Sequence, residues 1–216
     1  MKKIKFLILI SLISLFAKAQ NSKYVLAMEK NISLIDSGGK NPTAFQDAYN
    51  GFERIAGANP KEWLPLYYQS FCEVMMGMAQ TNSLKKDDYF DKAEALINKA
   101  DSLQKDNSEI FVMKSFVVSM QLSVDPQARG QVLGMKSGML LGKAMQLDPE
   151  NPRAYYLKGQ GLMYTPEQWG GGKDKAIPVL ETAVAKFAKF KPANSIMPNW
   201  GEARCKAVLE QAKKPE

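Results

Sequence analysis

The sequence predicts an all-α protein in which helix hairpins stack into an α-solenoid, and two observations carry this prediction. Apolar residues recur at spacings of three and four along nearly the whole chain, which is the period of a helix, and no run alternates as a strand does. Small residues recur at a step of about 45 residues, and such a step is typical of repeat architectures. With 45% hydrophobic and 24% charged residues, the composition is that of a folded globular protein.

The first 19 residues have the pattern of a secretory signal peptide. A basic start with Lys2 and Lys3 precedes an apolar run over residues 6–16, and Ala17-Lys18-Ala19 supplies a small-x-small cleavage site. The run is shorter than the roughly 20 residues that a membrane-spanning helix needs. We therefore expect cleavage after about Ala19 and a periplasmic or secreted location. Residues 20–216 are then one helical repeat domain with no transmembrane segment.

The charge balance argues against a nucleic-acid-binding protein. The full sequence has 29 Lys and Arg against 22 Asp and Glu, and four of these lysines lie in the first 19 residues. The remaining chain carries 25 basic and 22 acidic residues, a net charge of +3. Because the basic residues are scattered among acids rather than gathered in a stripe, we expect no nucleic-acid partner.

Turn residues divide the chain into nine expected helices. Asn59-Pro60, the run from Asp148 to Pro152 and the three glycines at 170–172 are residues that end or begin helices. The expected helices cover about residues 23–37, 42–57, 61–80, 86–104, 107–123, 127–147, 152–164, 172–190 and 199–213. We expect the last of them to cap the open end of the stack.

Two series of small residues define the repeat. Ser70, Ser115 and Gly159 each follow a turn, and they lie 45 and 44 residues apart. A second series recurs in the preceding helices at steps of 45, 44 and 39 residues, as a small residue followed seven later by a small or aliphatic one: Ala48 and Ile55, Ala93 and Ala100, Ser137 and Ala144, and more weakly Ala176 and Ala183. Residues seven apart share a helix face, and small ones let a neighbouring helix approach closely. Hairpins that cannot bury their apolar faces alone are therefore expected to stack.

The junctions between hairpins resemble the tetratricopeptide repeat. The best matches are residues 144–151 (Ala-Met-Gln-Leu-Asp-Pro-Glu-Asn) running into 154–159 (Ala-Tyr-Tyr-Leu-Lys-Gly), and residues 48–60. The resemblance covers most of the mature chain in about four copies, although the steps exceed the 34 residues of that family. The excess falls at 76–88 and 123–134, between the two helices of a hairpin, and predicts extended hairpin tips.

The resemblance implies a concave groove lined by the first helix of each hairpin. The positions carried over, with Ser70, Ser115 and Gly159 as anchors, are Tyr67, Phe71, Met75, Val112, Phe116, Met120, Arg153, Tyr156, Gln160 and Tyr164. Aromatic, methionine and arginine side chains are typical of interface anchors. The alternative is that these residues belong to the core, or that the hairpin tips fold over and fill the groove.

Catalytic and metal-binding constellations are not expected. The chain has no histidine, which removes histidine bases and most zinc sites, and Cys72 and Cys205 are interpreted as core residues rather than a disulfide. The segment Gly170-Gly171-Gly172-Lys173 lacks the first glycine, the Ser or Thr and the preceding strand of a phosphate-binding loop. We expect no enzyme activity, no metal and no cofactor.

Two irregular segments stand out. Residues 166–172 form a glycine-rich loop that carries Trp169, and residues 191–200 form a proline-bounded linker that ends at Trp200. We expect both tryptophans to pack over the core. The alternative for the first loop is that Trp169 binds a ligand.

The favoured function is an exported interaction module that holds a peptide or protein, such as an envelope component, in the concave groove. The alternative is a small-molecule or glycan binder, or less readily a hydrolase, that uses the Trp169 loop. A purely structural subunit of an envelope complex is a third reading, which the residues barely separate from the first.

Overall fold

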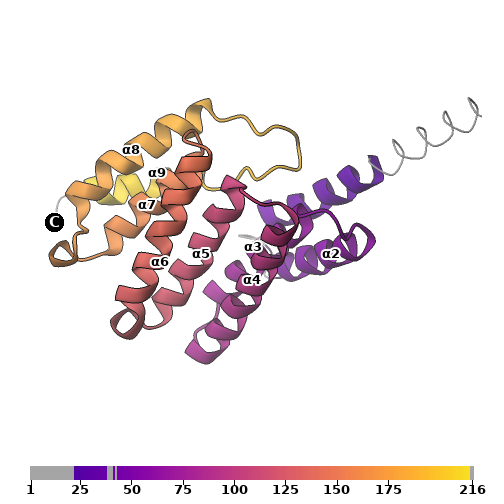
Figure 1. Cartoon of the computed structure of the whole chain (residues 1–216), viewed down its shortest axis with the longest axis horizontal. Coiled ribbons are helices and arrows are strands. Elements are labelled where there is room, and N and C mark those ends of the chain that lie inside the picture. The colour runs from indigo at the N-terminus through magenta and orange to yellow at the C-terminus, as the bar shows by residue number, and fades with distance from the viewer. Residues whose placement is uncertain (1–21, 38–40, 42, 215–216) are drawn as a thin grey trace, which may run out of the picture.

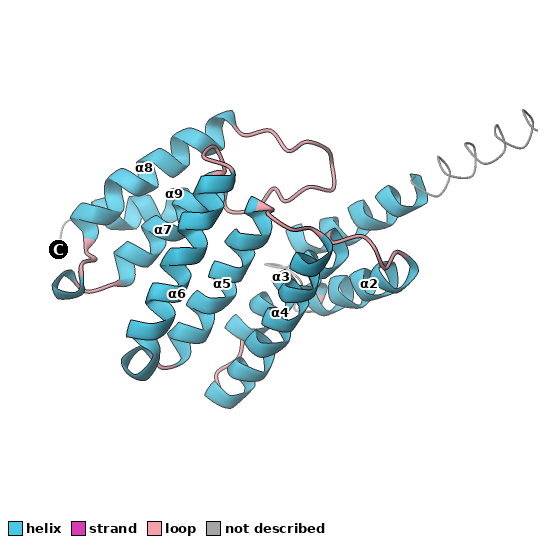
Figure 2. Cartoon of the chain, viewed as in Figure 1, coloured by secondary structure: helices cyan, strands magenta, loops and turns pink. Residues whose placement is uncertain are grey.

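The computed structural model describes residues 22–37, 41 and 43–214, and within these ranges every regular element is a helix (Figure 2). After a helix over residues 22–36, the elements are α2 (Ala44–Ala58), α3 (Leu64–Met78), α4 (Ser83–Leu103), α5 (Ser108–Val124), α6 (Pro126–Leu147), α7 (Pro152–Tyr164), the 3₁₀ turn η1 (Glu167–Trp169), α8 (Lys173–Lys189) and α9 (Glu202–Lys213). The predicted signal peptide lies outside the described residues. Among the described helices, none is long and apolar enough to cross a membrane.

Successive helices pair as hairpins and the hairpins stand side by side (Figure 1). The pairs α3/α4, α5/α6 and α7/α8 make the most extensive contacts, and α9 packs on α8 and α7 at the C-terminal end. The all-α stack and its C-terminal capping helix are therefore confirmed.

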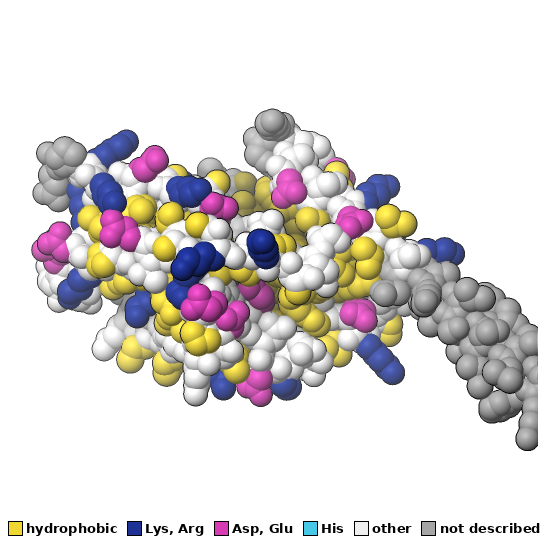
Figure 3. All heavy atoms as spheres, turned by 90° about the horizontal axis from the view of Figure 1, so that it is seen from above, with side chains coloured by type: hydrophobic (Ala, Val, Ile, Leu, Met, Phe, Trp, Pro, Cys, Tyr) yellow, Lys and Arg dark blue, Asp and Glu magenta, His cyan; other side chains and the backbone are white. Residues whose placement is uncertain are grey.

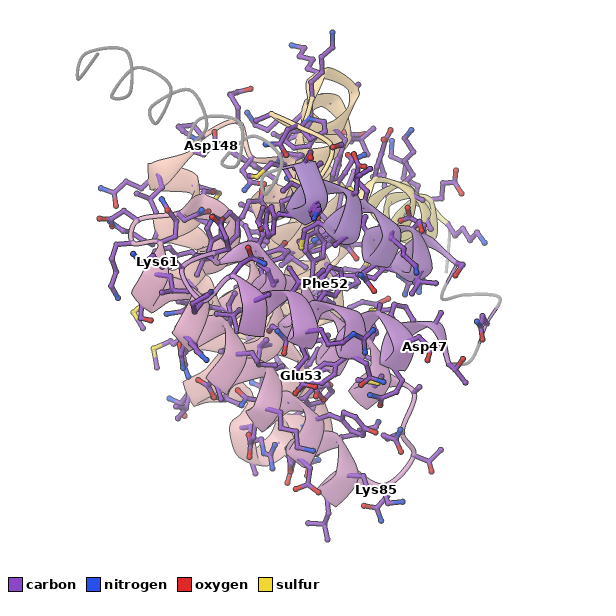
Figure 4. The ribbon with its side chains drawn as sticks, turned by 90° about the vertical axis from the view of Figure 1, so that its right-hand side faces the viewer. Asp47, Phe52, Glu53, Lys61, Lys85 and Asp148 are labelled. Atoms are coloured by element: carbon purple, nitrogen blue, oxygen red, sulfur yellow. The ribbon has the colours of Figure 1, made fainter. Side chains whose placement is uncertain are left out.

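The amphipathic helix α2 shows how the sequence pattern produces this packing. It buries Ala44, Ala48, Phe52 and Ile55, which recur at spacings of three and four and so lie on one face. Glu53, on the opposite face, is exposed. Figure 4 views the stack from this end, with Phe52 and Glu53 labelled.

The repeated small residues lie where helices cross. Ser70 Oγ donates to the carbonyl oxygen of Ala93 at 2.8 Å, and Ser115 Oγ lies 2.8 Å from Ser137 Oγ. A Cβ built on Gly159 would meet Leu180 Cγ at 2.7 Å, so a larger residue would push α7 and α8 apart. These positions are the close approaches that the 45-residue step predicts.

The prediction of extended hairpin tips is wrong. The connection from α3 to α4 spans only residues 79–82, and Asp125 alone separates α5 from α6. The extra length instead lengthens the second helices, α4 and α6, to 21 and 22 residues. The physical reason is local capping. The side chains of Asn82 and Asp125 accept hydrogen bonds from the backbone N–H groups of Lys85 and Ala128, and Pro126 starts α6 with a preset φ.

Both cysteines belong to the core. Cys72 and Cys205 are fully buried and free, as the sequence predicts. Burial raises the pKa of each thiol, to about 11 for Cys205, so neither is a thiolate at neutral pH.

Candidate ligand-binding face

The ten predicted groove residues all lie on α3, α5 and α7, on what we call the inner face. On α3 and α5 they recur every four residues, which keeps them on one side of each helix. The structure divides them into two levels along the helices. The covered level is nearer the N-terminal ends of the helices and contains Tyr67, Phe71, Val112, Phe116, Arg153 and Tyr156; the open level contains Met75, Met120, Gln160 and Tyr164.

All six residues of the covered level are buried. The segment over residues 190–201, here called the covering segment, connects α8 to α9 (Figure 1). It contacts Tyr67, Phe71, Phe116, Arg153 and Tyr156 of this level. Its Ile196 carbonyl oxygen accepts a hydrogen bond from the Tyr68 hydroxyl at 3.0 Å. This segment near the C-terminal end of the chain fills the covered level, and not the hairpin tips that the sequence analysis gave as the alternative.

Trp200 is the central contact of the covering segment. Its ring centroid lies 5.4 Å from that of Phe71 and 5.6 Å from that of Phe116. Its indole N–H donates to the Tyr67 hydroxyl at 2.8 Å. The expectation that Trp200 packs over the core is confirmed, whereas Trp169 is 67% exposed and that part of the expectation is wrong.

Gly201 lets the covering segment turn into α9. Its φ is +108°, a conformation that side chains other than glycine rarely adopt. A Cβ at this position would lie 3.1 Å from Phe187 Cζ and 3.5 Å from Tyr156 Cδ1. A side chain at this position would therefore strain the backbone and require Phe187 to shift.

A buried ion pair anchors the covered level. The Arg153 guanidinium donates from Nε to Glu109 Oε2 at 2.8 Å and from Nη2 to Glu109 Oε1 at 2.5 Å. Asn151 Nδ2 donates to the same carboxylate at 2.8 Å. Arg153 is only 1% exposed, and such burial is tolerated because the charges are paired in a bidentate geometry.

Local helix capping places this pair. Glu109 and Arg153 both lie in the first turn of their helices, and the side chains of Asn107 and Asn151 accept hydrogen bonds from their backbone N–H groups. Pro152 at the start of α7 further favours the helix there. The two charged residues therefore emerge from equivalent positions of neighbouring repeats, 44 residues apart.

Two features of Arg153 are not explained by the ion pair. Its Nη1 is buried and, among the described residues, has no hydrogen-bond partner. The ring of Phe190, the first residue of the covering segment, lies 4.5 Å from Cζ. Burial lowers the pKa of Arg153, but the Glu109 carboxylate outweighs this effect and raises it overall. The guanidinium therefore stays charged.

The tyrosines of the covered level are held in their neutral form. Burial, followed by the charge of Glu109, raises the pKa of Tyr67 well above its ordinary value. Burial also raises the pKa of Tyr156 to about 12. Each hydroxyl can therefore donate a hydrogen bond at any physiological pH.

The open level has no comparable cover. Met75, Met120 and Gln160 are half-buried, and Tyr164 is 57% exposed at the end of α7. Met78 and Trp169 add further exposed apolar surface at the C-terminal ends of α3 and η1. These residues present methionine and aromatic surface to solvent.

The surface has two hollows, one beside the covered level and one formed by α4, α5 and α6. One, of about 400 Å³, is lined by residues 104 and 106–109, by Leu147 and Asp148, by Arg153 and by the covering segment. The other, of about 510 Å³, lies between α4, α5 and α6 and is bordered by the ion pairs Arg129–Asp87 and Lys136–Glu94. On the surface seen from above in Figure 3, acidic and basic side chains are interspersed. No group of three or more metal-ligating side chains occurs in the described part of the chain.

Sequence reasoning placed the ten residues on one face but missed the groups that organise it. Glu109, Asn151 and Phe190 were not predicted. The recurrence of an asparagine before a helix, at Asn107 and Asn151, was the available signal for the first two. No local signal marks Phe190, because its partner Arg153 is 37 residues away. The binding role of the ten residues stays a prediction.

Comparisons with known proteins show a similarity to a solved structure. No protein-family model matches the chain, and no curated protein matches it. Among solved structures, it is similar to the HusA haemophore from Porphyromonas gingivalis, with a TM-score of 0.79 and 36% sequence identity. The alignment covers 88% of this chain and 92% of that one. The similarity therefore extends over nearly the whole length of both proteins.

Proposed function

The chain belongs to the family of the HusA haemophore, and from this premise we propose that it is an exported, non-enzymatic protein that binds haem or a related porphyrin. The observation that carries the proposal is 36% identity over 92% of a protein that is named for carrying haem. This similarity favours the small-molecule alternative over a peptide-binding groove. In this proposal haem is cargo rather than a resident cofactor.

The open level of the inner face is the surface that best suits a porphyrin. A porphyrin is a broad, flat and largely apolar ring, and small-molecule sites are lined mainly by apolar and aromatic side chains. Met75 and Met120 supply adaptable apolar contact, and Tyr164 supplies an exposed ring. Trp169 extends this surface toward the loop that the sequence singled out.

The residues available as an axial ligand narrow the proposal further. Protein ligands to haem iron are histidine, cysteine, methionine or tyrosine. The chain has no histidine, and both cysteines are buried. Met75 and Met120 on the open level are half-buried, whereas the phenol of Tyr164 is 57% exposed, so we assign the role to Tyr164 rather than to a methionine.

Absorbance titration of the mature chain with haem tests the proposal. The wild-type chain is expected to shift the Soret band to a saturating end point. Tyr164→Ala should weaken haem binding at least tenfold. Tyr164→Phe should lose the spectral signature of a phenolate ligand while it keeps binding of metal-free protoporphyrin IX.

Tyr89 offers a matched control, because it lies on α4 rather than on the inner face. Tyr89→Ala is expected to bind haem as the wild type does. A wild-type chain that leaves the Soret band unchanged would contradict the proposal, and equal losses in the two alanine variants would contradict the assignment to Tyr164.

The tetratricopeptide-like interaction role and export remain proposals of the same kind. Peptide capture at the covered level requires the covering segment to leave, because that segment occupies the place of a peptide. Capture from an envelope extract by wild-type and Tyr164→Ala baits would identify a protein partner at the open level. The N-terminal mass of the mature protein would test cleavage after Ala19.

A further inference from the structure

We propose that Trp200 is a built-in occupant of a second binding position, a slot for a planar aromatic ring that carries a carboxylate, and that such a ligand binds by displacing the covering segment. The inference deepens the proposed function and rests on it for the natural ligand, since a porphyrin with its propionate groups is a planar ring of this class. The slot lies at the covered level, next to the open level.

The apolar part of the slot is a pair of aromatic rings. The Trp200 indole contacts Phe71 at an interplanar angle of 43° and Phe116 at 27°, with centroid separations of 5.4 and 5.6 Å. These are ordinary stacking and tilted contacts, and they depend on a flat π-system rather than on an indole in particular. Another flat aromatic ring gains the same contacts once Trp200 leaves.

The polar end of the slot has a donor that nothing in the described chain uses. Arg153 Nη1 is buried without a hydrogen-bond partner, although Nε and Nη2 of the same group each donate to Glu109. Buried polar groups are normally paired, so an unpaired donor needs an explanation. A ligand carboxylate supplies the missing acceptor.

Tyr67 provides a second hydrogen bond to the same ligand group. Its hydroxyl accepts from the Trp200 indole at 2.8 Å and makes only a long contact of 3.5 Å to Glu109 Oε2. The hydroxyl proton is donated to Glu109 Oε2 only over this long distance, so it can turn to a ligand carboxylate oxygen when the indole leaves, and its raised pKa keeps that proton in place. Because Glu109 and Arg153 together carry no net charge, the ligand carboxylate is held by hydrogen bonds from Arg153 Nη1 and Tyr67 and not by an unbalanced positive charge.

Trp200 and Arg153 are joined through one short stretch of chain. A Cβ on Gly201 would lie 3.6 Å from Arg153 Cγ, so the backbone that follows Trp200 rests on the arginine stem. Phe190, at the other end of the covering segment, lies over the guanidinium. Displacement of this segment therefore uncovers the aromatic pair and the arginine together.

The covering segment can move without unfolding a long helix. Residues 190–201 contain no α-helical turn, and α8 and α9 end and begin at its borders. Lys191, Ala193, Asn194, Ser195 and Asn199 are exposed, and its anchors are Ile196, Pro198 and Trp200. Because the closed form excludes the ligand, the apparent affinity is reduced by the fraction of molecules that are open.

Ligand binding by Trp200→Ala is the test, with Tyr89→Ala on α4 as the aromatic control away from the inner face. The probes are protoporphyrin IX, 2-naphthoate and the uncharged analogue 2-naphthalenemethanol. Trp200→Ala is expected to bind 2-naphthoate at least tenfold more tightly than wild type, and at least tenfold more tightly than it binds the alcohol. It should also bind protoporphyrin IX more tightly, whereas Tyr89→Ala should not change 2-naphthoate binding.

A measurement on the unaltered tryptophan guards against a misfolded variant. The indole N–H signal of Trp200 in the wild-type protein, identified by its loss in Trp200→Leu, should shift on saturation with 2-naphthoate as its hydrogen bond to Tyr67 breaks. An unmoved signal would overturn the inference. Weaker or equal 2-naphthoate binding by a folded Trp200→Ala or Trp200→Leu chain would do so too.

The outcomes separate this inference from the proposed function. If no chain binds a porphyrin but Trp200→Ala binds 2-naphthoate in preference to the alcohol, the porphyrin proposal fails and the slot stands. If wild type binds haem and Trp200→Ala binds it no more tightly, the proposed function stands and the slot is overturned.

Discussion

The covered and open levels of the inner face are built from the same three helices, yet they differ in what contacts them. At the covered level, Trp200 and its neighbours bury an aromatic pair and the ion pair of Arg153 with Glu109. At the open level, Tyr164 and the methionines meet solvent. Helical spacing thus determines which residues share a face, while a segment distant in sequence determines which of them a ligand can reach.

The largest expected effect comes from breaking the ion pair of the covered level. Glu109→Gln leaves the Arg153 charge buried without a counter-charge, and the loss of one partner of a buried pair costs about 3–5 kcal/mol. Urea denaturation should show this loss of unfolding free energy. The exposed pair Lys206–Glu202 is the control, since Glu202→Gln should cost less than about 1 kcal/mol. Equal effects would mean that the covered level is hydrated.

Truncation of one residue at each level of α5 sharpens the comparison. Phe116→Ala removes a buried ring from the covered level and should cost about 3–5 kcal/mol. Met120→Ala, one turn further along, is half-buried and should cost about 1 kcal/mol. Thermal or urea unfolding of the two variants measures the difference. Similar losses would contradict the division into two levels.

Glu73 on α3 is a buried carboxyl that, unlike Glu109, has an oxygen without a partner in the described chain. Burial raises its pKa to about 6, against the opposing charge of Lys92. Because the folded state holds the proton more tightly than the unfolded state, stability is present at acidic pH and falls as the pH rises from about 4.5 through 6. The loss should be about 1–2 kcal/mol by pH 7.

Unfolding of wild type and Glu73→Gln between pH 4.5 and 7.5 measures this slope. The variant should lack the contribution and should be the more stable of the two at pH 7. A pH slope that is the same in both chains would show that another group is responsible.

The smallest stability effect is expected at the open level. Tyr164→Ala removes a side chain that is mostly exposed, so its unfolding free energy should stay within about 0.5 kcal/mol of wild type. The same variant is expected to lose haem affinity, which separates a binding role from a structural one. A large loss of stability would place Tyr164 in the core instead.

Much of the fold was predictable because its signals are local. The helix expected over 61–80 is observed as Leu64–Met78, and the one over 152–164 as Pro152–Tyr164. Small residues such as Ser70 and Gly159 marked the crossing points, since only small side chains allow such close approach. The prediction of extended hairpin tips was wrong because caps at Asn82 and Asp125 extend α4 and α6 over residues that the resemblance to the tetratricopeptide repeat assigned to loops.

The sequence by itself determined an all-α stack, its repeat and the face on which the ten residues lie, because helical period, capping and side-chain size act over a few residues. Only the tertiary structure decided that Trp200 covers Phe71 and Phe116 at the covered level while Tyr164 at the open level is exposed to solvent. The covering segment meets α3 about 130 residues away from it in the chain, as the hydrogen bond between Tyr68 and Ile196 shows. Such a contact depends on how all the intervening hairpins stack on one another, and no pattern within a few residues of the sequence predicts that arrangement.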